Sequence, residues 1–428
     1  SVYVSQLGYS LNAAGELDLV GLINGEMEGP LVAAGDWQSA IPFSLAGVTV
    51  NRNGKPSNLG AIQTNDILYW NQSMNTLWVS SDKVTGVIQA LEPSATNPAS
   101  VQILGRTFEI ETAQAAYALS DLGTYGVGDT VSLLLGRGGG VAAVAGPSAV
   151  QNEMCGVVAR TERGTYDDGH GGTYTADTVT ILATDGGTYQ YQWTADYLDA
   201  GDPVGISFSA EGEVVLKRLS STGLSGKVSE DGTKLGSLSF ASGAEILDVT
   251  GSSAVKIFSS RLAGLNLTRD MVTYYSLNGS GEINRLILED ATGDAGQYGV
   301  LTRMETLGEG MSAAYSYEYD LNGTSYTLPA TTTRYPVSVG AIRITGDPAD
   351  PDRLLPLTQV RADSIHGSVL RSGSRSYTIA DQVVVYEYRD RQYFLSTLDR
   401  VQEQGLSLTG WYDRPESEGG RIRVIVAQ

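Results

Sequence analysis

The residues that most often carry catalysis are scarce in this chain. Only two histidines occur among the 428 residues, His170 and His366, together with a single cysteine, Cys155. Neither histidine neighbours a serine elbow or a cysteine nucleophile, so Ser-His-Asp and Cys-His catalysis have little support. Cys155 opens an apolar stretch, where a small buried residue suits a strand, and we interpret it as structural rather than reactive.

Two acidic segments could bind a metal ion. Residues 166–174 gather His170 with acids and glycines, but no second histidine and no ligand spacing follow, which favours a hairpin tip. Asp347, Asp350 and Asp352 could hold Ca²⁺ between their carboxylates. The prolines between them favour an ordinary acidic loop, and the glycine and final glutamate of an EF-hand are missing. We therefore predict no cofactor, with calcium at these aspartates as the alternative.

Two further patterns bear on enzymatic chemistry. The glycine-rich run 136–140 resembles a phosphate-binding loop, but it lacks the Lys-Ser/Thr ending and a following helix, which favours a hairpin turn. Acidic residues are abundant enough for a glycosidase that uses a carboxylate pair, whose separation a sequence does not reveal. Small modules leave little room for a cleft within one of them, although the seams between modules are candidate sites. We predict a non-catalytic protein, with a carbohydrate-active enzyme as the minor alternative.

Aromatic residues offer a candidate binding surface. An exposed platform of rings could bind a sugar, whereas rings on the strands of a small barrel more often belong to its core. Core packing is therefore the favoured interpretation, and a glycan- or protein-binding adhesin module is the alternative function. The candidate binding residues are Tyr69, Trp70, Trp78, Tyr191 and Trp193.

Composition limits the class of partner. The formal net charge is −20 and the pI is about 4.5, so the surface repels nucleic-acid phosphates and anionic lipid. With one cysteine there is no disulfide framework, and no run approaches the ~20 apolar residues of a membrane span. The chain starts at Ser1 without a methionine or leader, so we expect a mature or trimmed fragment.

Two markers recur along the chain at intervals of about 70 residues. One marker is an aspartate that precedes an apolar strand, and the other is a glycine that opens a short apolar strand. The spacing between the two markers is nearly constant over four modules, which indicates a repeat protein. The fifth module lacks the aspartate, and the sixth repeat looks truncated. The glycines are Gly21, Gly86, Gly156, Gly226, Gly299 and Gly367, and the aspartates are Asp66, Asp129, Asp202, Asp270 and Asp381.

The second module is the clearest template for the fold. Three short strands precede a helical stretch with a cap at Thr112, and two strands joined by a glycine turn follow. This order fits an OB-like five-stranded barrel, and an SH3-like barrel fits nearly as well. We therefore predict an all-β chain of small barrels with short helices in an elongated array. The expected modules are 1–85, 86–155, 156–225, 226–298 and 299–428, the last including the truncated sixth repeat.

Several segments resemble a known family of surface proteins. Residues 66–70, 74–79, 83–86, 128–136 and 419–425 are together similar to the repeat region of S-layer-homology-domain-containing surface proteins of gut Firmicutes. The resemblance covers nearly the whole chain. It implies an exported envelope protein whose S-layer homology modules bind cell-wall polymer. Those anchoring modules are not visible in this sequence, and the resemblance carries over no catalytic residue.

The sequence thus predicts a structural or spacer ectodomain. We expect it outside the cell, on a bacterial surface or cell wall, with an envelope glycan or another surface protein as the partner class. Each module contacts mainly its neighbours in such an array, so stability is expected to be roughly a sum of module and interface terms.

Overall fold

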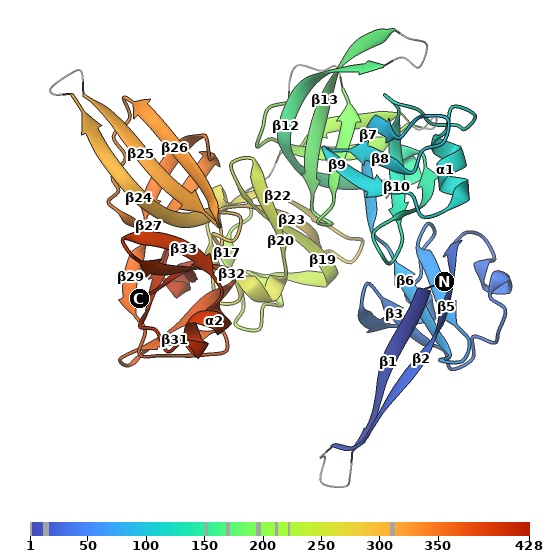
Figure 1. The fold of residues 1–428 in the computed structure, drawn as a ribbon, viewed down its shortest axis with the longest axis horizontal. Coiled ribbons are helices and arrows are strands. Elements are labelled where there is room, and N and C mark those ends of the chain that lie inside the picture. Colours follow the sequence, from blue (N-terminus) through green and yellow to red (C-terminus); the bar gives the residue numbers. More distant parts are fainter. Residues whose placement is uncertain are drawn as a thin grey trace.

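The computed structural model describes residues 2–11, 17–149, 153–167, 172–193, 198–209, 213–220, 223–308 and 313–428. Within these residues it consists mostly of strands, with two short α-helices. The predicted all-β fold of small barrels in series is confirmed, because the sheets curl into compact groups that follow one another along the chain (Figure 1). We name these groups units 1 to 6.

Units 1 to 3 form the N-terminal half. Unit 1 contains β1 (Val2–Leu11), β2 (Leu17–Val32), β3 (Thr49–Arg52), β4 (Lys55–Ser57), β5 (Ile67–Asn71) and β6 (Thr76–Ser80). Unit 2 contains β7 (Lys83–Glu92), β8 (Ser100–Ile103), β9 (Arg106–Glu109), α1 (Ala113–Leu119), β10 (Thr130–Leu135) and β11 (Val141–Ala145). Unit 3 contains β12 (Glu153–Asp167), β13 (Thr173–Ala183), β14 (Thr188–Gln192), β15 (Pro203–Phe208) and β16 (Val214–Arg218).

Units 4 to 6 form the C-terminal half. Unit 4 contains β17 (Gly226–Lys227), β18 (Lys234–Leu235), β19 (Leu238–Thr250), β20 (Ser253–Ile257), β21 (Asn266–Leu267), β22 (Val272–Leu277) and β23 (Ile283–Glu289). Unit 5 contains β24 (Gln297–Leu307), β25 (Ala314–Leu321), β26 (Thr324–Thr331), β27 (Gly340–Asp347) and β28 (Asp350–Pro356). Unit 6 contains β29 (Thr358–Arg361), β30 (Ser364–His366), β31 (Val369–Ser372), β32 (Arg375–Arg389), β33 (Gln392–Ser396), α2 (Leu398–Glu403), β34 (Leu408–Tyr412) and β35 (Ile422–Ala427).

Units 2, 3 and 5 share one strand order. In each, the first strand pairs with both the second and the fourth, so the order across the sheet is third, second, first, fourth, fifth. In unit 2 a parallel bridge between Ile110 and Val141 brings the end of the third strand against the fifth. Helix α1 lies between the third and fourth strands, and the hydroxyl of Thr112 caps it by accepting the N–H of Ala115 at 3.0 Å, as predicted. This is the OB-like order.

Units 1, 4 and 6 share a second arrangement. In each, an earlier strand runs parallel to the last strand of the unit: β3 beside β6, β19 beside β23, and β32 beside β35. The last strand also pairs in antiparallel fashion with the strand before it. In unit 6 the short strand β29 pairs with β34, so residues 358–427 form a sheet of their own. The range 299–428, predicted as one module, is therefore divided between two sheets.

Three marker aspartates make the same turn at the entry to a strand: Asp66 before β5, Asp129 before β10 and Asp202 before β15. The N–H of each donates to the carbonyl oxygen three residues earlier, at 3.1 Å for Asp66 and Asp129 and 3.0 Å for Asp202. Each carboxylate in return accepts the N–H of that earlier residue, at 2.9, 2.8 and 2.8 Å. A short acidic side chain closes such a turn well, which explains the repeat. Asp381 does not belong to this set, because it lies within β32.

The marker glycines Gly86, Gly156 and Gly299 lie in the first strands of units 2, 3 and 5. A Cβ atom on Gly156 or Gly299 would overlap a carbonyl oxygen of the neighbouring strand. Two residues after each glycine the register with the second strand shifts. Because such a bulge increases the twist of a strand, glycine and bulge together help to close a small barrel. Gly21 is different, since it pairs with Gly8 in the hairpin of β1 and β2.

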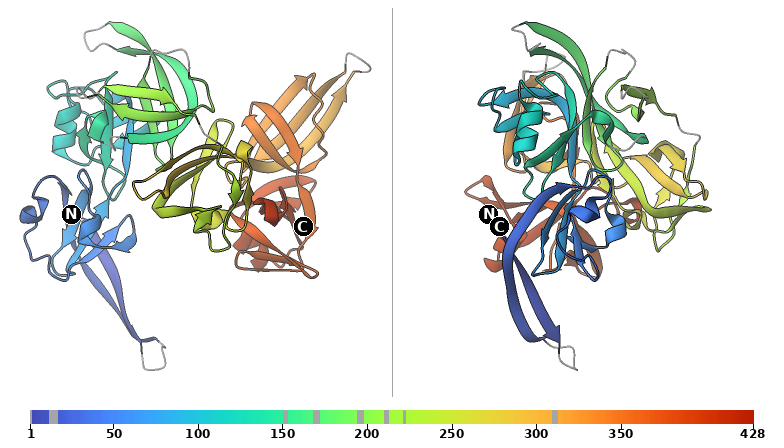
Figure 2. Two further views of the ribbon diagram at one scale, coloured as in Figure 1. Left: turned by 180° about the vertical axis from the view of Figure 1, so that it is seen from behind. Right: turned by 90° about the vertical axis from the view of Figure 1, so that its right-hand side faces the viewer.

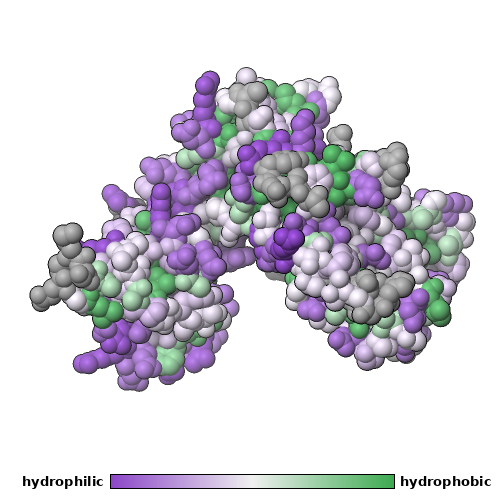
Figure 3. Space-filling view, turned by 90° about the horizontal axis from the view of Figure 1, so that it is seen from above, coloured by the Kyte–Doolittle hydropathy of each residue, from purple (hydrophilic) through white to green (hydrophobic). Residues whose placement is uncertain are grey.

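The six units follow a bent path across the molecule rather than a straight one. Units 1 to 3 lie on one side, unit 4 in the middle, and units 5 and 6 on the other side, while the β1–β2 hairpin projects from unit 1 (Figures 1 and 2). Seen from above, the surface is largely hydrophilic, with small hydrophobic patches between (Figure 3). None of the helices among the described residues has the length and hydropathy to span a bilayer.

Candidate functional site

The structure places most of the predicted aromatic residues in cores. Tyr69 and Trp78 belong to the hydrophobic cluster between units 1 and 2, with side chains 2% and 9% exposed. Tyr191 is buried in unit 3, where its ring stacks on Tyr189 with centroids 6.5 Å apart. These rings pack inward because each lies on the buried face of its strand, so they do not form an exposed platform.

The remaining two aromatic candidates are half-buried. Trp70 packs against the core of unit 1, and its indole N–H donates to the Oε2 of Glu28 at 3.0 Å. Trp193 packs against the core of unit 3. The five candidates are thus distributed over separate cores in two parts of the molecule.

The candidate metal-binding residues do not converge either. Asp347 and Asp350 lie opposite each other in the turn from β27 to β28, and their side chains and that of Asp352 are exposed. The described part of the chain holds no group of three or more acidic, histidine or cysteine side chains that could bind a metal ion. The three aspartates of the calcium alternative are therefore not part of such a group. His170 lies outside the described residues, and His366 is exposed at the end of β30.

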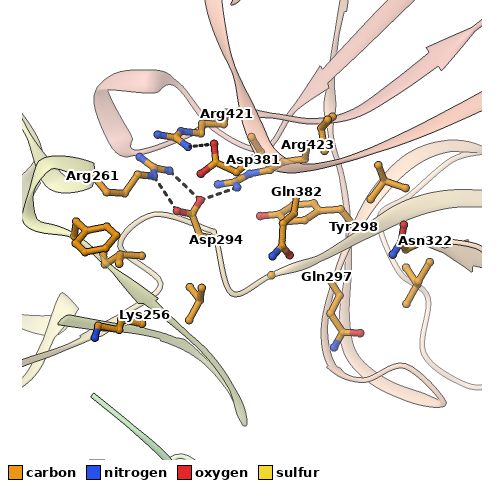
Figure 4. A pocket seen from close by; sticks show the side chains of 18 of the residues that line it. Lys256, Arg261, Asp294, Gln297, Tyr298, Asn322, Asp381, Gln382, Arg421 and Arg423 are labelled. Atoms are coloured by element: carbon orange, nitrogen blue, oxygen red, sulfur yellow. Dashed lines mark hydrogen bonds and ion pairs between the residues drawn. The ribbon is translucent and has the colours of Figure 1, made fainter. Parts of the chain in front are cut away.

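A cleft lies where units 4, 5 and 6 meet (Figure 4). Its volume is about 730 Å³. Unit 4 contributes β20 and the turn after it, unit 5 contributes the start of β24 and the turn from β25 to β26, and unit 6 contributes β32 and β35. The lining includes residues 255–258, 260–261, 296–298, 321–322, 380–384, Asp294, Tyr326, Arg421 and Arg423.

The segment that joins unit 4 to unit 5 is fixed by a buried carboxylate. Asp248, on β19, accepts the N–H groups of Ala291 and Thr292 at 2.9 and 2.8 Å and also the hydroxyl of Thr292. Burial raises the pKa of Asp248, against the opposing effect of these hydrogen bonds. The turn at the base of the cleft is therefore held from inside unit 4.

Asp290 connects unit 4 to both following units. Its carboxylate accepts two hydrogen bonds from Arg343 of unit 5, at 2.6 and 3.0 Å, and one from Arg414 of unit 6 at 2.9 Å. Burial acts to raise the pKa of Asp290, but the bonds and charge of Arg343, followed by those of Arg414, outweigh it and lower the pKa. A bidentate pair of this kind fixes orientation as well as distance.

Asp294 connects Arg261 of unit 4 to Arg423 of unit 6. It accepts two hydrogen bonds from Arg261, at 2.8 and 3.0 Å, and one from Arg423 at 2.8 Å (Figure 4). Arg423 also lies 3.2 Å from Asp413 and under the ring of Tyr298, whose hydroxyl donates to Asp413 at 3.0 Å. Burial opposes ionisation of Asp294, but Arg261 and Arg423 lower its pKa overall.

These ion pairs limit the chemistry of the two carboxylates. A general acid needs a pKa near the working pH, whereas the pKa of Asp290 and that of Asp294 are both lowered. The two carboxylates therefore stay ionised and bound to guanidinium groups. Their arrangement is suited to holding three units together and leaves neither as a proton donor.

Arg421 has the weakest ion pair among the arginines of the cleft. Its guanidinium lies 3.6 Å from the carboxylate of Asp381, a side chain that is 92% exposed. Burial, followed by the positive charge of Arg261, lowers the pKa of Arg421. With Lys256, Arg261 and Arg423 it gives the cleft four cations, against Asp294 and Asp381 in the lining and Asp413, which pairs with Arg423 at 3.2 Å. The cleft can therefore accept an anionic group.

Sequence reasoning named the seams between modules as candidate sites but did not identify the residues of this cleft. One signal was present: Arg421 and Arg423 alternate with Ile422 and Val424 in a strand that has apolar residues on both faces. An arginine at a buried strand position needs a carboxylate partner, so the pattern predicts a buried ion pair. Nothing in the sequence indicates which carboxylate that is.

Comparisons with protein-family models, with curated proteins and with solved structures found no match to this chain.

Proposed function

We propose that this chain is a non-catalytic structural ectodomain of a bacterial cell-surface protein. The resemblance to S-layer-associated surface proteins suggests the location, outside the cell and close to the wall. The observation that carries the structural role is that every unit is joined to the next by a buried contact. Small domains linked in this way keep fixed positions, whereas flexible linkers allow them to move.

The first two joints involve groups from both partners. Between units 1 and 2, Tyr69 and Trp78 pack against Leu134, and the Tyr69 hydroxyl donates to Glu111 at 2.5 Å. Between units 2 and 3, β7 and β14 form a parallel bridge, which joins the two barrels in one ten-stranded sheet. Neither joint depends on a single side chain.

The later joints are equally continuous. Cys155 and Val157 of unit 3 share a hydrophobic cluster with Leu247, Val249 and Ile287 of unit 4. Units 5 and 6 share another cluster, formed by residues of β24, β27, β32 and β35. The ion pairs of Asp290 and Asp294 then tie unit 4 to both. A rigid body of this kind suits a spacer that holds other parts of a surface protein at a set distance.

The proposal is tested by locating the protein and by asking what it binds. Antibody labelling and protease treatment of intact source cells are expected to reach the chain, because an ectodomain faces the medium. Co-sedimentation of the purified chain with isolated cell walls at moderate salt is expected to leave it in the supernatant. Failure to reach the chain in intact cells would contradict the location, and salt-resistant pelleting would favour the adhesin alternative.

A further inference from the structure

We propose that the cleft between units 4, 5 and 6 binds an extended acidic peptide segment of a partner protein. This role goes beyond the structural function proposed above. It rests on unpaired strand edges, an excess of positive charge and an exposed aromatic ring that occur together in one cleft.

Two stretches of strand at the cleft have backbone that pairs with no further strand among the described residues. Strand β20 pairs only with β19, and three of its five residues line the cleft. On the other wall, the pairing of β32 with β35 jumps from Ile379 to Val384. The pairing with β31 ends at Thr378, and that with β33 begins at Val385. Residues 380–383 therefore present backbone without a ladder partner, and an added strand binds to such backbone.

The charge of the cleft selects an acidic partner. Lys256, Arg261, Arg421 and Arg423 line the cleft together with Asp294 and Asp381, and Asp413 pairs with Arg423 at 3.2 Å. One positive charge therefore remains in excess at the cleft, although the whole chain carries a net charge of −20. Arg261 and Arg423 are already bound to Asp294. Arg421 is held only by an exposed aspartate at 3.6 Å, so an incoming carboxylate can replace that partner in a charge-assisted bond.

The cleft also has an apolar wall. Phe258 follows β20 at the cleft and is 69% exposed, an uncommon state for a large aromatic side chain. Side chains of an extended peptide point alternately to its two faces. A segment that alternates acidic and apolar residues therefore places carboxylates toward Arg421 and apolar groups toward Phe258. The volume of about 730 Å³ lies within the range of ~300–1,000 Å³ typical of ligand sites.

A polypeptide fits these features better than an acidic glycan does. A glycan supplies carboxylates but has no regular series of N–H and carbonyl groups to pair with β20 or residues 380–383. Backbone pairing therefore distinguishes the two classes of ligand.

The test uses the whole chain and a fluorescein-labelled peptide with four Glu-Val repeats, and fluorescence anisotropy measures binding. Three comparison ligands separate the contributions: a Gln-Val peptide, the Glu-Val peptide N-methylated at alternate residues, and octagalacturonate as an acidic glycan. Arg421→Gln is the test variant. Arg361→Gln, on the exposed strand β29 outside the cleft, makes the same change in charge as a control.

We expect the Glu-Val peptide to bind at least about ten-fold more tightly than each comparison ligand, since bonds to charged groups contribute about 1.5–3 kcal/mol. We expect Arg421→Gln to weaken binding by about ten-fold or more and Arg361→Gln to leave it unchanged. Circular dichroism of both variants checks the fold. Equal binding by octagalacturonate or by the N-methylated peptide, equal loss in the two variants, or no saturable binding would overturn the proposal. None of these results bears on the structural role, which cell labelling tests separately.

Discussion

The Asp294→Asn variant tests the joint between units 4, 5 and 6. The substitution keeps the size of the side chain and removes the charge that two guanidinium groups share. The side chains of Arg261 and Arg423 are only 13% and 4% exposed, and that of Asp294 is 19% exposed. Breaking a buried ion pair costs about 3–5 kcal/mol, and allowance for the partial exposure of Asp294 reduces this to about 2–4 kcal/mol.

Hydrogen exchange measured by mass spectrometry reports this change locally, which matters because a chain of six units does not unfold in one step. A loss of about 3 kcal/mol corresponds to a roughly 100-fold faster exchange of amides that open with the joint. We expect the increase in residues 289–298 and 411–424, and not in units 1 to 3.

The matched control is Asp381→Asn, which removes the same charge from an exposed partner of Arg421. An exposed pair contributes at most about 1 kcal/mol, so exchange is expected to change less than ten-fold. Equal exchange in wild type and Asp294→Asn, or equal effects of the two substitutions, would refute the reasoning.

Three further predictions concern the acid stability of the joint, the reactivity of Cys155 and the role of a marker glycine. Folding lowers the pKa values of Asp290 and Asp294, so these two carboxylates stabilise the folded state fully above the unfolded-state pKa of about 3.9. This stabilisation is lost as the pH falls through the pKa values of the folded state. Hydrogen exchange measured during an acid titration should therefore show this joint opening first. Burial raises the pKa of Cys155 to about 11, so iodoacetamide at pH 8 should modify it only in denaturant, and rapid native labelling would contradict its burial. Gly156→Ala should destabilise unit 3 by at least about 2 kcal/mol in urea unfolding. The control Gly138→Ala, whose added Cβ meets open space, should change the unfolding free energy by no more than about 1 kcal/mol. Similar changes in the two variants would contradict the close approach of the strands at Gly156.

Local signals predicted much of the fold. The predicted features include the cap at Thr112, the glycine turn between β10 and β11, and the aspartates that precede apolar strands. All three depend on residues close together in sequence, and the structure contains the cap, the glycine turn and the aspartates before β5, β10 and β15. It was harder to predict that unit 6 forms a sheet of its own. Its first strand, β29, is short and largely exposed, so it lacks the apolar alternation that identifies a strand.

The cleft depends on contacts between distant residues. Arg414 and Asp290 are 124 positions apart, and Arg423 and Asp294 are 129 apart. Local patterns indicate that an arginine occupies a buried position in a strand, but they do not show which carboxylate will lie opposite it. The aromatic candidates were ambiguous for a related reason: alternation places a ring on one face of a strand without showing which face is covered.

Small-angle X-ray scattering of the whole chain tests the central claim most directly, namely that buried joints hold six small barrels as one rigid body. We expect a single profile that matches the bent arrangement of Figure 1 and stays unchanged between low and moderate salt, because the joints are buried and weakly screened. A profile typical of flexibly linked domains, or dimensions that increase with salt, would contradict the claim.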